Sequence, residues 1–410
     1  MGMSLGDLYD PLRAHLSDPY PFYERARREE PLFFSPVVGA WVVTKMADAR
    51  VILRDGRTFS SANTLRPYTP FPPAVLEELS KGFPLRETLI TMDGEGHRRL
   101  RVLAAAALSP ERVTATERYI TERASLLIDG FAKDGRVDFM AEYANRLPVD
   151  VIARLVGFAE EDSRAFGDDS RAAAAIGMGH QFRSDEEQIE CARAWVRFQR
   201  FIMRYVTDRA AAPRDDVISE YIAASAPGGA PLTAEQMEGL VGLILTVALP
   251  GHITTSALLG NGLLRLLSQP DQWRLLCERP DLVPNAAEEI ARYDTPTHVF
   301  LRVTTTDTSV GGRDFPAGTE IAVCLASANR DEEAFERAEE FDITRPLKAN
   351  VVFGQGAHYC PGAGLARRQI EISLRLLAER LPDLRLVPDQ RIEYRGTVDH
   401  RGPLALHLQW

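Results

Sequence analysis

Residues Phe353–Arg367, which read FGQGAHYCPGAGLAR, carry the strongest structural signal in the chain. Glycines on both sides of Cys360 let the backbone come close to the sulfur and aim N–H groups at it. Pro361 fixes φ just before a helix that we expect to begin near Gly362, so a helix N-terminus favours the thiolate anion. His358 can reach an anionic group on the same side. A protein would present one axial thiolate to a haem iron in this way.

Other interpretations of Cys360 explain less. A lone cysteine is usually a small buried apolar residue, and we assign that role to Cys191, Cys277 and Cys324. It does not explain why glycines and a histidine surround Cys360. A zinc site needs about four ligands at short spacing, and the run holds no second cysteine. A phosphate-binding loop needs Gly-Lys-Ser/Thr, which is absent.

The run F-G-x-G-x-H-x-C-x-G-x-x-L-A-R resembles the haem-binding signature of the bacterial cytochrome P-450 haem-thiolate monooxygenases. The resemblance covers nearly the whole chain. It implies heme b (iron protoporphyrin IX) as the cofactor and Cys360 as the axial ligand of its iron. The residues of the run that the resemblance places at the haem are Phe353, Gly354, His358, Cys360 and Gly362.

Composition limits the class of protein. The chain has 410 residues, of which 45% are hydrophobic, enough for a sizeable core. Its net charge of −10 argues against a nucleic-acid binder. We expect no membrane span, because no stretch of eighteen or more purely apolar residues occurs. A polar, proline-rich start and four unclustered cysteines favour a soluble, cytoplasmic protein, and the resemblance implies a monomer.

Helical periodicity dominates, so the predicted class is mainly α with a minor β portion. A capping-box pattern at Thr233 and Gln236 predicts a long helix that ends near Leu267. A second helix should follow Cys360. These helices fit the family's fold, with a long central helix over the haem, in a single domain over residues 1–410. Strands are expected at about 31–45, around Gly39, at 300–325, and at 391–410 as two strands around a turn.

Glu289 and Arg292 form an E-x-x-R tetrad one helical turn apart. Taken alone, it is best explained as a surface ion pair. Its distance upstream of Cys360 resembles that of the family's buried Glu-Arg pair, which holds the cysteine loop in place. The resemblance implies a third partner from Phe341–Arg345, and Arg345 is the residue chosen.

A haem carries two propionates, which need cationic or hydrogen-bonding partners when they are buried. The resemblance draws these partners from three parts of the chain, namely His97 and Arg101, then Arg302, then His358. Any one of them alone would be read as a surface or core residue. Together, and in this order, they indicate haem binding.

The central helix departs from the family pattern. The family's oxygen-activating stretch reads roughly Ala-Gly-x-acid-Thr-Thr, and here it is PGHITT at 250–255. The resemblance assigns catalytic roles to Gly251, Thr254 and Thr255, with the Thr254 hydroxyl supporting proton delivery to dioxygen. Ile253 occupies the acid position and cannot relay a proton. Two explanations stay open: water reaches the site by another route, or the substrate supplies a polar group or undergoes a different reaction.

The substrate pocket is sketched from the same resemblance. Its expected lining comes from the central helix, the turn after the Glu-Arg helix and the tip of the C-terminal hairpin: Thr246, Leu249, Thr254, Thr297, His298, Val299, Asp399 and His400. The loop Ser60–Thr91 should form part of a lid, with Arg66 and Arg86 as polar contacts. Polar side chains at 298, 399 and 400 favour a polar or ionisable substrate, unless they face solvent.

We expect a monooxygenase that inserts one oxygen atom from O2 into a small organic substrate, by hydroxylation or epoxidation, and tailors a secondary metabolite. No flavin or iron–sulfur motif occurs, so electrons from NAD(P)H should arrive through a separate ferredoxin and ferredoxin reductase. The substrate could be free or tethered to a carrier protein. The alternative, which Ile253 keeps open, is a haem-thiolate enzyme that performs ring closure, C–N or C–C coupling, or peroxide-driven oxidation. A non-catalytic relative would have lost the run around Cys360, which is intact.

Overall fold

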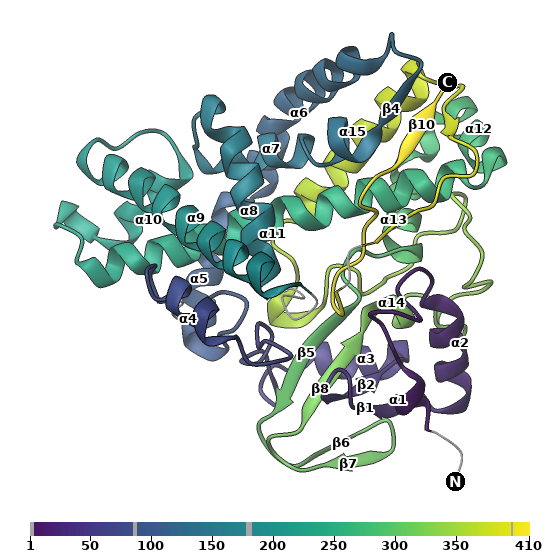
Figure 1. Ribbon diagram of the computed structural model, residues 1–410, viewed down its shortest axis with the longest axis horizontal. Helices are drawn as coiled ribbons and strands as arrows, with labels where there is room; N and C mark the ends of the chain where they lie inside the picture. Colours follow the sequence, from purple (N-terminus) through teal and green to yellow (C-terminus); the bar gives the residue numbers. More distant parts are fainter. Residues whose placement is uncertain (1–3, 85–87, 178–182, 395–396) are drawn as a thin grey trace. The chain divides into compact units, whose positions relative to one another are not determined.

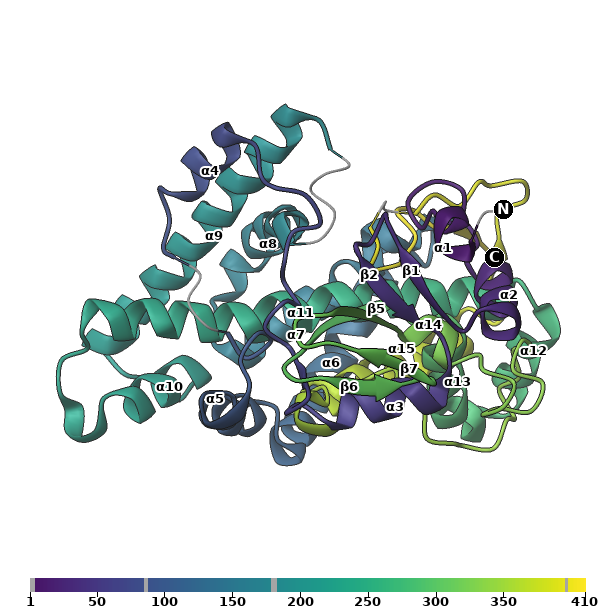
Figure 2. The ribbon, with the colours of Figure 1, turned by 90° about the horizontal axis from the view of Figure 1, so that it is seen from below.

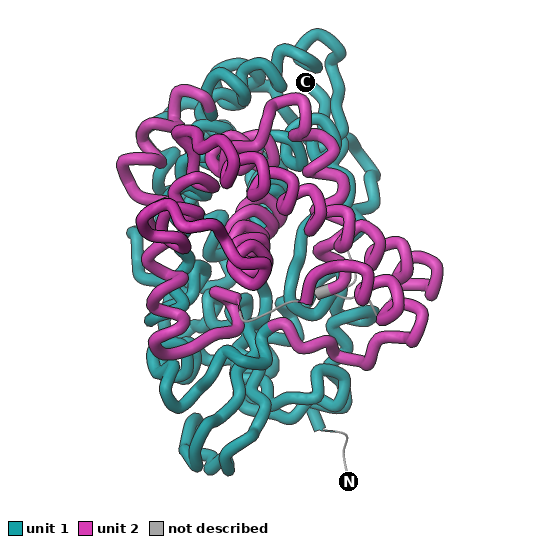
Figure 3. Tube along the Cα trace, turned by 90° about the vertical axis from the view of Figure 1, so that its left-hand side faces the viewer, with its two compact units in different colours: residues 1–64, 120–147, 254–410 teal, residues 65–119, 148–253 magenta. Residues whose placement is uncertain are grey.

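The computed structural model describes residues 4–84, 88–177, 183–394 and 397–410, and most of this part is helical (Figure 1). The predicted class, mainly α with small sheets, is confirmed. The chain forms two compact units (Figure 3). The first comprises Met1–Thr64, Ile120–Leu147 and Thr254–Trp410, and the second comprises Leu65–Tyr119 and Pro148–Ile253. The single domain expected from the sequence stays a prediction.

The first unit contains α15, the helix predicted to follow Cys360. It begins directly after Gly362 and buries a stripe that includes Leu365, Ile370 and Leu374, because apolar residues recur every three or four positions. The helices and short helical turns of this unit are α1 (Leu5–Leu8), α2 (Tyr20–Glu29), α3 (Met46–Arg54), η1 (Met140–Ala144), α12 (Pro270–Glu278), η5 (Pro280–Leu282), α13 (Val283–Tyr293), α14 (Leu325–Ala328), η6 (Gly356–His358) and α15 (Ala363–Arg380).

The main sheet of the first unit has the strand order β1-β2-β8-β5-β3 (Figure 2). β2 and β8 run parallel, and the other neighbours pair antiparallel. The hairpin predicted around Gly39 is confirmed, with φ +69° at that glycine. A smaller hairpin joins β6 and β7. The strands are β1 (Leu32–Ser35), β2 (Ala40–Val43), β3 (Phe59–Ser60), β5 (Val299–Thr304), β6 (Thr308–Val310), β7 (Arg313–Phe315) and β8 (Glu320–Cys324).

The C-terminal region differs from the predicted hairpin. Here β10 (His407–Gln409) pairs with β4 (Arg136–Asp138) and β9 (Arg385–Leu386) rather than with a strand from 391–410. Between the described parts of 391–410, the pairing is one isolated bridge that joins Tyr394 and Pro403. Strands of two or three residues are too short to show a period-2 pattern, so β4 and β9 could not be recognised from the sequence.

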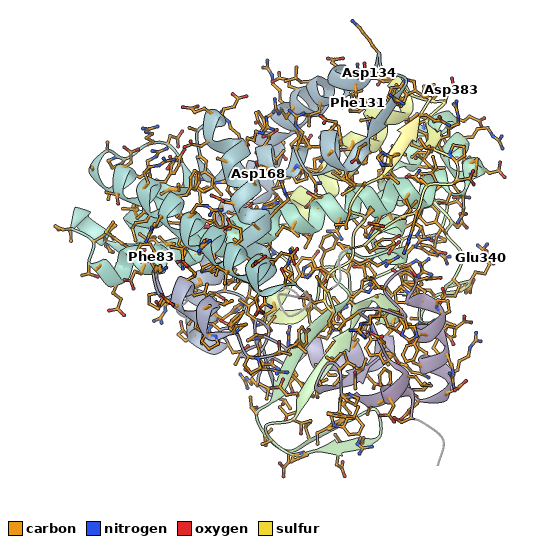
Figure 4. All side chains as sticks on the ribbon, in the orientation of Figure 1. Phe83, Phe131, Asp134, Asp168, Glu340 and Asp383 are labelled. Carbon is orange, nitrogen blue, oxygen red and sulfur yellow. The ribbon has the colours of Figure 1, made fainter. Side chains whose placement is uncertain are left out.

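The second unit is helical. Its elements are α4 (Pro73–Leu79), α5 (Gly94–Ala107), η2 (Glu160–Asp162), α8 (Ser163–Gly177), α9 (Asp185–Ala211), α10 (Val217–Ser225) and η4 (Pro227–Gly229). The side-chain amide of Gln199 on α9 pairs with both backbone groups of Phe83, at 2.9 Å from the Phe83 N–H and 2.8 Å from the Phe83 carbonyl. Figure 4 labels Phe83. Because Gln199 is buried, this pairing anchors the segment that follows α4 onto helix α9.

Three helices have residues in both units: α6 (Pro110–Phe131), α7 (Leu147–Val156) and α11 (Ala234–Leu267). α11 is the predicted long helix, and its capping box is present, with Gln236 N–H donating to Thr233 Oγ1 (3.2 Å) and Thr233 N–H to Gln236 Oε1 (2.8 Å). It stays helical through Pro250. Among the described residues, α11 is the helix that is long and apolar enough to cross a membrane. However, 56% of its most apolar 18-residue stretch is buried inside the protein.

Candidate functional site

The loop before α15 holds Cys360 in a defined backbone conformation. Gly354 and Gly356 both have φ +69°, which favours glycine. A Cβ atom on Gly356 would lie 2.6 Å from the carbonyl oxygen of Leu53, so a larger residue would displace the loop. The N–H of Cys360 donates to the carbonyl of Phe353 (2.8 Å). The half-buried Cys360 therefore lies just before the N-terminus of α15, where the helix dipole favours a thiolate.

The predicted Glu-Arg pair is buried and has the third partner that the sequence indicated. Glu289 on α13 accepts from Arg292 Nε (2.7 Å) and Nη2 (2.8 Å), and from Arg345 Nε (3.1 Å). The backbone N–H of Asp342 also donates to Glu289 (3.0 Å). Both arginines donate to the carbonyl of Glu340. The carboxylate is thus fully enclosed by donors, unlike that of a surface ion pair.

Asn329, which the sequence analysis missed, connects this cluster to the cysteine loop. Its carbonyl accepts from Arg292 Nη1 (2.9 Å), and its side-chain Oδ1 accepts from the N–H of Val351 (2.9 Å). The carbonyl of Val351 in turn accepts from the N–H of Gly354, six residues before Cys360 (3.0 Å). Asn329 is completely buried. An unbroken chain of hydrogen bonds therefore runs from the Glu289 cluster to the start of the loop.

The cationic residues expected at the propionates lie in different units. Arg302 on β5 of the first unit is buried, and its guanidinium donates to the carbonyl of Leu301 (2.7 Å). His358 ends η6 in the same unit. In the second unit, His97 is buried on α5, and Arg101 lies one turn further along. Burial, and then the charge of Arg101, lower the pKa of His97.

In the second unit, the residues of α11 pack closely against their neighbours. A Cβ atom on Gly251 would lie 2.9 Å from Ile152 Cδ1 of α7, so a larger residue there would have to displace the Ile152 side chain. His252 is buried, and its Nε2 lies 2.8 Å from Ser170 Oγ on α8. Burial, and then the charge of Arg171, lower the pKa of His252 to about 3. This neutral imidazole points to α8 and does not replace the acid missing at 253.

Other predicted positions of α11 differ in burial. Thr246 and Leu249 are half-buried in the second unit, where the Thr246 hydroxyl donates to the carbonyl of Gly242 (2.7 Å). Thr254 is half-buried and Thr255 is buried, both in the first unit. The lid residue Arg86 lies outside the described residues.

Two segments predicted to line the pocket lie side by side in the first unit. Thr297 and His400 form an antiparallel bridge, and the N–H of His298 donates to the carbonyl of Asp399 (2.7 Å). The side chains of Asp399 and His400 approach each other to 3.2 Å (Oδ2 to Nδ1). Val299 follows as the first residue of β5. The structure therefore brings the turn after α13 and the C-terminal segment together.

The ring of His298 packs among tyrosines of α2. Its centroid lies 6.0 Å from that of Tyr20 and 6.1 Å from that of Tyr23, and its Nδ1 lies 3.4 Å from the Tyr23 hydroxyl. Burial, and then the charge of Arg401, lower the pKa of His298 to about 3. The imidazole is therefore neutral, and its exposure to a substrate stays a prediction.

A second buried charge cluster surrounds Asp294, the residue after α13. Its carboxylate accepts from the Tyr20 hydroxyl (2.7 Å) and from Arg265 Nε (2.8 Å), and Arg401 Nε lies 3.5 Å away. Burial would raise the pKa of Asp294, but the charges of Arg265, Arg401 and Arg330 hold it well below its usual range. This cluster was not predicted from the sequence, because its members are far apart along the chain.

Comparisons with known proteins identify the family. The family model described as Cytochrome P450 matches residues 181–382. A vitamin D(3) 25-hydroxylase from Pseudonocardia autotrophica is 34% identical over 402 residues, which cover 94% of this chain and 92% of the relative. The chain belongs to the cytochrome P450 family. This cytochrome P450 is accordingly a monooxygenase, and it binds heme b.

Solved structures share the fold over the whole length. A structure of the cytochrome P450 CREJ in complex with (4-ethylphenyl) dihydrogen phosphate has a TM-score of 0.91 and 31% identity, and covers 99% of this chain and 100% of its own. A structure of P450BioI in complex with hexadec-9Z-enoic acid ligated acyl carrier protein has a TM-score of 0.84 and 28% identity. It covers 96% of this chain and 99% of its own.

The residues present fit a haem. A thiolate ligand needs space and backbone freedom around the sulfur, and a Cβ atom on Gly362 would lie 3.9 Å from Cys360 Sγ. A buried propionate needs a cation, and the first unit offers the buried guanidinium of Arg302. The first unit therefore supplies both kinds of group that a thiolate-ligated haem requires.

Proposed function

We propose that this cytochrome P450 inserts one oxygen atom from O2 into a small organic substrate by hydroxylation or epoxidation, as a tailoring step in secondary metabolism. The second oxygen atom leaves as water, and the step consumes two electrons and two protons. The conformation of the Cys360 loop carries the proposal, because a half-buried sulfur before a helix N-terminus suits a thiolate ligand. The name of the 34% identical relative, a hydroxylase, supports the reaction type.

Cys360 would bind the haem iron through its thiolate sulfur. When bound, the haem supplies the chemistry of dioxygen activation, and a thiolate ligand favours O–O cleavage. Arg302 and His358, together with His97 and Arg101, would hold the propionates by charge-assisted hydrogen bonds. Phe353, Gly354 and Gly362 would shape the surroundings of the sulfur. The cluster of Glu289, Arg292 and Arg345 would keep the loop in place through Asn329.

The hydroxyl groups of Thr254 and Thr255 would hold protons for the reaction. They would do so next to Gly251, which packs closely against Ile152. Electrons would come from NAD(P)H through a ferredoxin and its reductase, the usual partners of bacterial relatives. We further propose that the protein is a cytoplasmic monomer. A carrier-tethered substrate is a second form to test, since the P450BioI neighbour was solved with a fatty acid on its acyl carrier protein.

The substrate would be polar or ionisable at one end. The support for this comes from the bridge between Thr297 and His400, beside which the carboxylate of Asp399 and the imidazole of His400 lie together. Thr246 and Leu249 would line another, less polar part. The structure of CREJ with an aryl phosphate is a precedent among structural neighbours for a substrate with a charged end.

The decisive experiment compares two cysteine variants. Cys360→Ser should abolish the red-shifted Soret band that a thiolate-ligated ferrous haem gives with carbon monoxide. Cys277→Ser is the matched control, because Cys277 is half-buried like Cys360, and it should keep the band. An intact band in Cys360→Ser would remove the basis of the proposal.

A second candidate function follows from Ile253. An isoleucine cannot relay a proton, and the adjacent His252 is turned to Ser170 (2.8 Å). Oxidative ring closure, C–N or C–C coupling, or peroxide-driven oxidation would place different demands on proton delivery. Under this alternative, Ile253→Glu should leave the coupling of NAD(P)H use to product unchanged or lower. A large gain in coupling, with a single hydroxylated product, would exclude it.

A further inference from the structure

The C-terminal segment lies directly on α11 in the first unit. A Cβ atom on Gly402 would lie 2.6 Å from the Cβ of Ala257, and a Cβ atom on Gly260 would lie 2.9 Å from Cγ of Pro403. Both distances are shorter than real Cβ contacts allow. The segment and the helix therefore approach each other as closely as two glycines permit, in the part of α11 that follows Thr254.

Asn261 is the polar residue at this contact. Its side-chain Nδ2 donates to the carbonyl of Asp294 (3.1 Å) and to the carbonyl of Arg401 (3.2 Å). Asn261 is completely buried, and its Oδ1 has no hydrogen-bond partner among the described residues. Its two donated bonds join separate segments to one helix.

The two segments that Asn261 holds also pair with each other. The N–H of Arg401 donates to the carbonyl of Pro296 (2.8 Å), next to the bridge between Thr297 and His400. Asn261 lies seven residues after Thr254, which is two helical turns, so both residues lie on the same face of α11. The position of the paired segments along that face is therefore set relative to Thr254.

We propose that Asn261 is a positioning residue, which fixes the paired segments 294–298 and 399–401 on α11 and thereby sets where the polar end of the substrate lies relative to Thr254. The inference rests on the proposed function, because it takes the bridge at Thr297 and His400 as part of the substrate site. Asn261 does not touch substrate; it acts through the backbone carbonyls of Asp294 and Arg401.

Two variants of the haem-loaded protein test the proposal. Asn261→Leu removes both donated bonds while keeping the number and branching of the side-chain heavy atoms. Gly402→Ala keeps Asn261 but places a Cβ atom against Ala257, so it moves the segment by a different route. The control is Ser373→Ala on α15, which removes buried hydrogen bonds to Gln369 and from Tyr143 away from the segment.

Two measurements are made on each variant. The first is amide hydrogen exchange, which should become about tenfold faster in 399–401 when the donated bonds are lost, with no change at the N–H of Cys360. The second is the ratio of the dissociation constants of two haem-binding probes, imidazole and 4-phenylimidazole. Because the phenyl group extends further from the iron than imidazole alone does, the ratio should change about fivefold in Asn261→Leu and Gly402→Ala, and should stay constant in Ser373→Ala.

The outcomes separate the inference from the proposed function. If both test variants load haem and keep the wild-type probe ratio, the positioning role is wrong. If Ser373→Ala changes the ratio equally, the effect is general destabilisation and the role is also wrong. A wild-type protein without the thiolate band with carbon monoxide would instead contradict the proposed function, and the exchange result at 399–401 would still be interpretable.

Discussion

Replacing His252 with glutamine should make the protein less sensitive to acid. The imidazole is buried on α11 against Phe166 of α8, with ring centroids 5.6 Å apart, and its Nε2 lies 2.8 Å from Ser170 Oγ. Burial, and then the charge of Arg171, lower its pKa from 6.5 to about 3. In the unfolded chain, the same imidazole regains its ordinary pKa. Between these two values the unfolded state binds a proton that the folded state does not bind.

The sign and size of the effect follow from proton linkage. Above the ordinary pKa of His252 both states are neutral, and its titration has no effect on stability. As the pH falls, the unfolded state gains a proton first, so the free energy of unfolding decreases. A full difference of one proton changes it by about 1.36 kcal/mol per pH unit. Between about pH 7.5 and about pH 5, His252 should therefore lower the stability by about 2 kcal/mol.

The assay is urea unfolding of the haem-loaded protein at these two pH values. Between about pH 7.5 and about pH 5, the free energy of unfolding should decrease by about 2 kcal/mol more in the wild type than in His252→Gln. Ser170→Ala is the matched control: it should lower stability by about 1 kcal/mol at both pH values, through its lost hydrogen bond, and keep the wild-type pH dependence. An equal loss in wild type and His252→Gln would refute the reasoning.

Two further predictions concern the first unit. Glu289→Gln should lower the free energy of unfolding by about 3–5 kcal/mol, because it leaves the buried guanidinium of Arg292 uncompensated; Glu288→Gln, at a more exposed pair, should lower it by less than about 1 kcal/mol in the same urea titration. Gly356→Ala should speed haem transfer to apomyoglobin, because its Cβ would meet the carbonyl of Leu53. Gly312→Ala has a similar φ but open space around it, and an equal acceleration there would contradict this explanation.

The features that the sequence predicted depend on local patterns. The capping box at Thr233 and Gln236 and the long apolar run after it determine α11 without any distant partner. Gly354 and Gly356, before Cys360, mark backbone conformations that other residues rarely adopt. The partnership of Arg345 with Glu289 came from the family resemblance rather than from spacing, and the hydrogen bonds between them agree with it.

The features that the sequence did not predict depend on contacts between distant segments. β10 pairs with strands from 136–138 and 385–386, which are too short to recognise alone. Asn329 and Asn261 are single amides, and neither has a side-chain hydrogen bond to a nearby residue that would distinguish it in the sequence. The hydrogen bonds that explain them go to residues 22 positions or more away. Folding brings these partners together, and no periodicity records them.

The pattern of α11 bears on the missing acid. Gly251 packs closely against Ile152, and His252 is committed to Ser170, so the two residues before Ile253 both make structural contacts. After it, Asn261 is committed to the carbonyls of Asp294 and Arg401. None of these side chains is available to replace a proton-relaying acid. These contacts favour water, the threonine hydroxyls at 254 and 255, or the substrate itself as the proton source on α11, and the coupling of Ile253→Glu separates the two proposed reaction types.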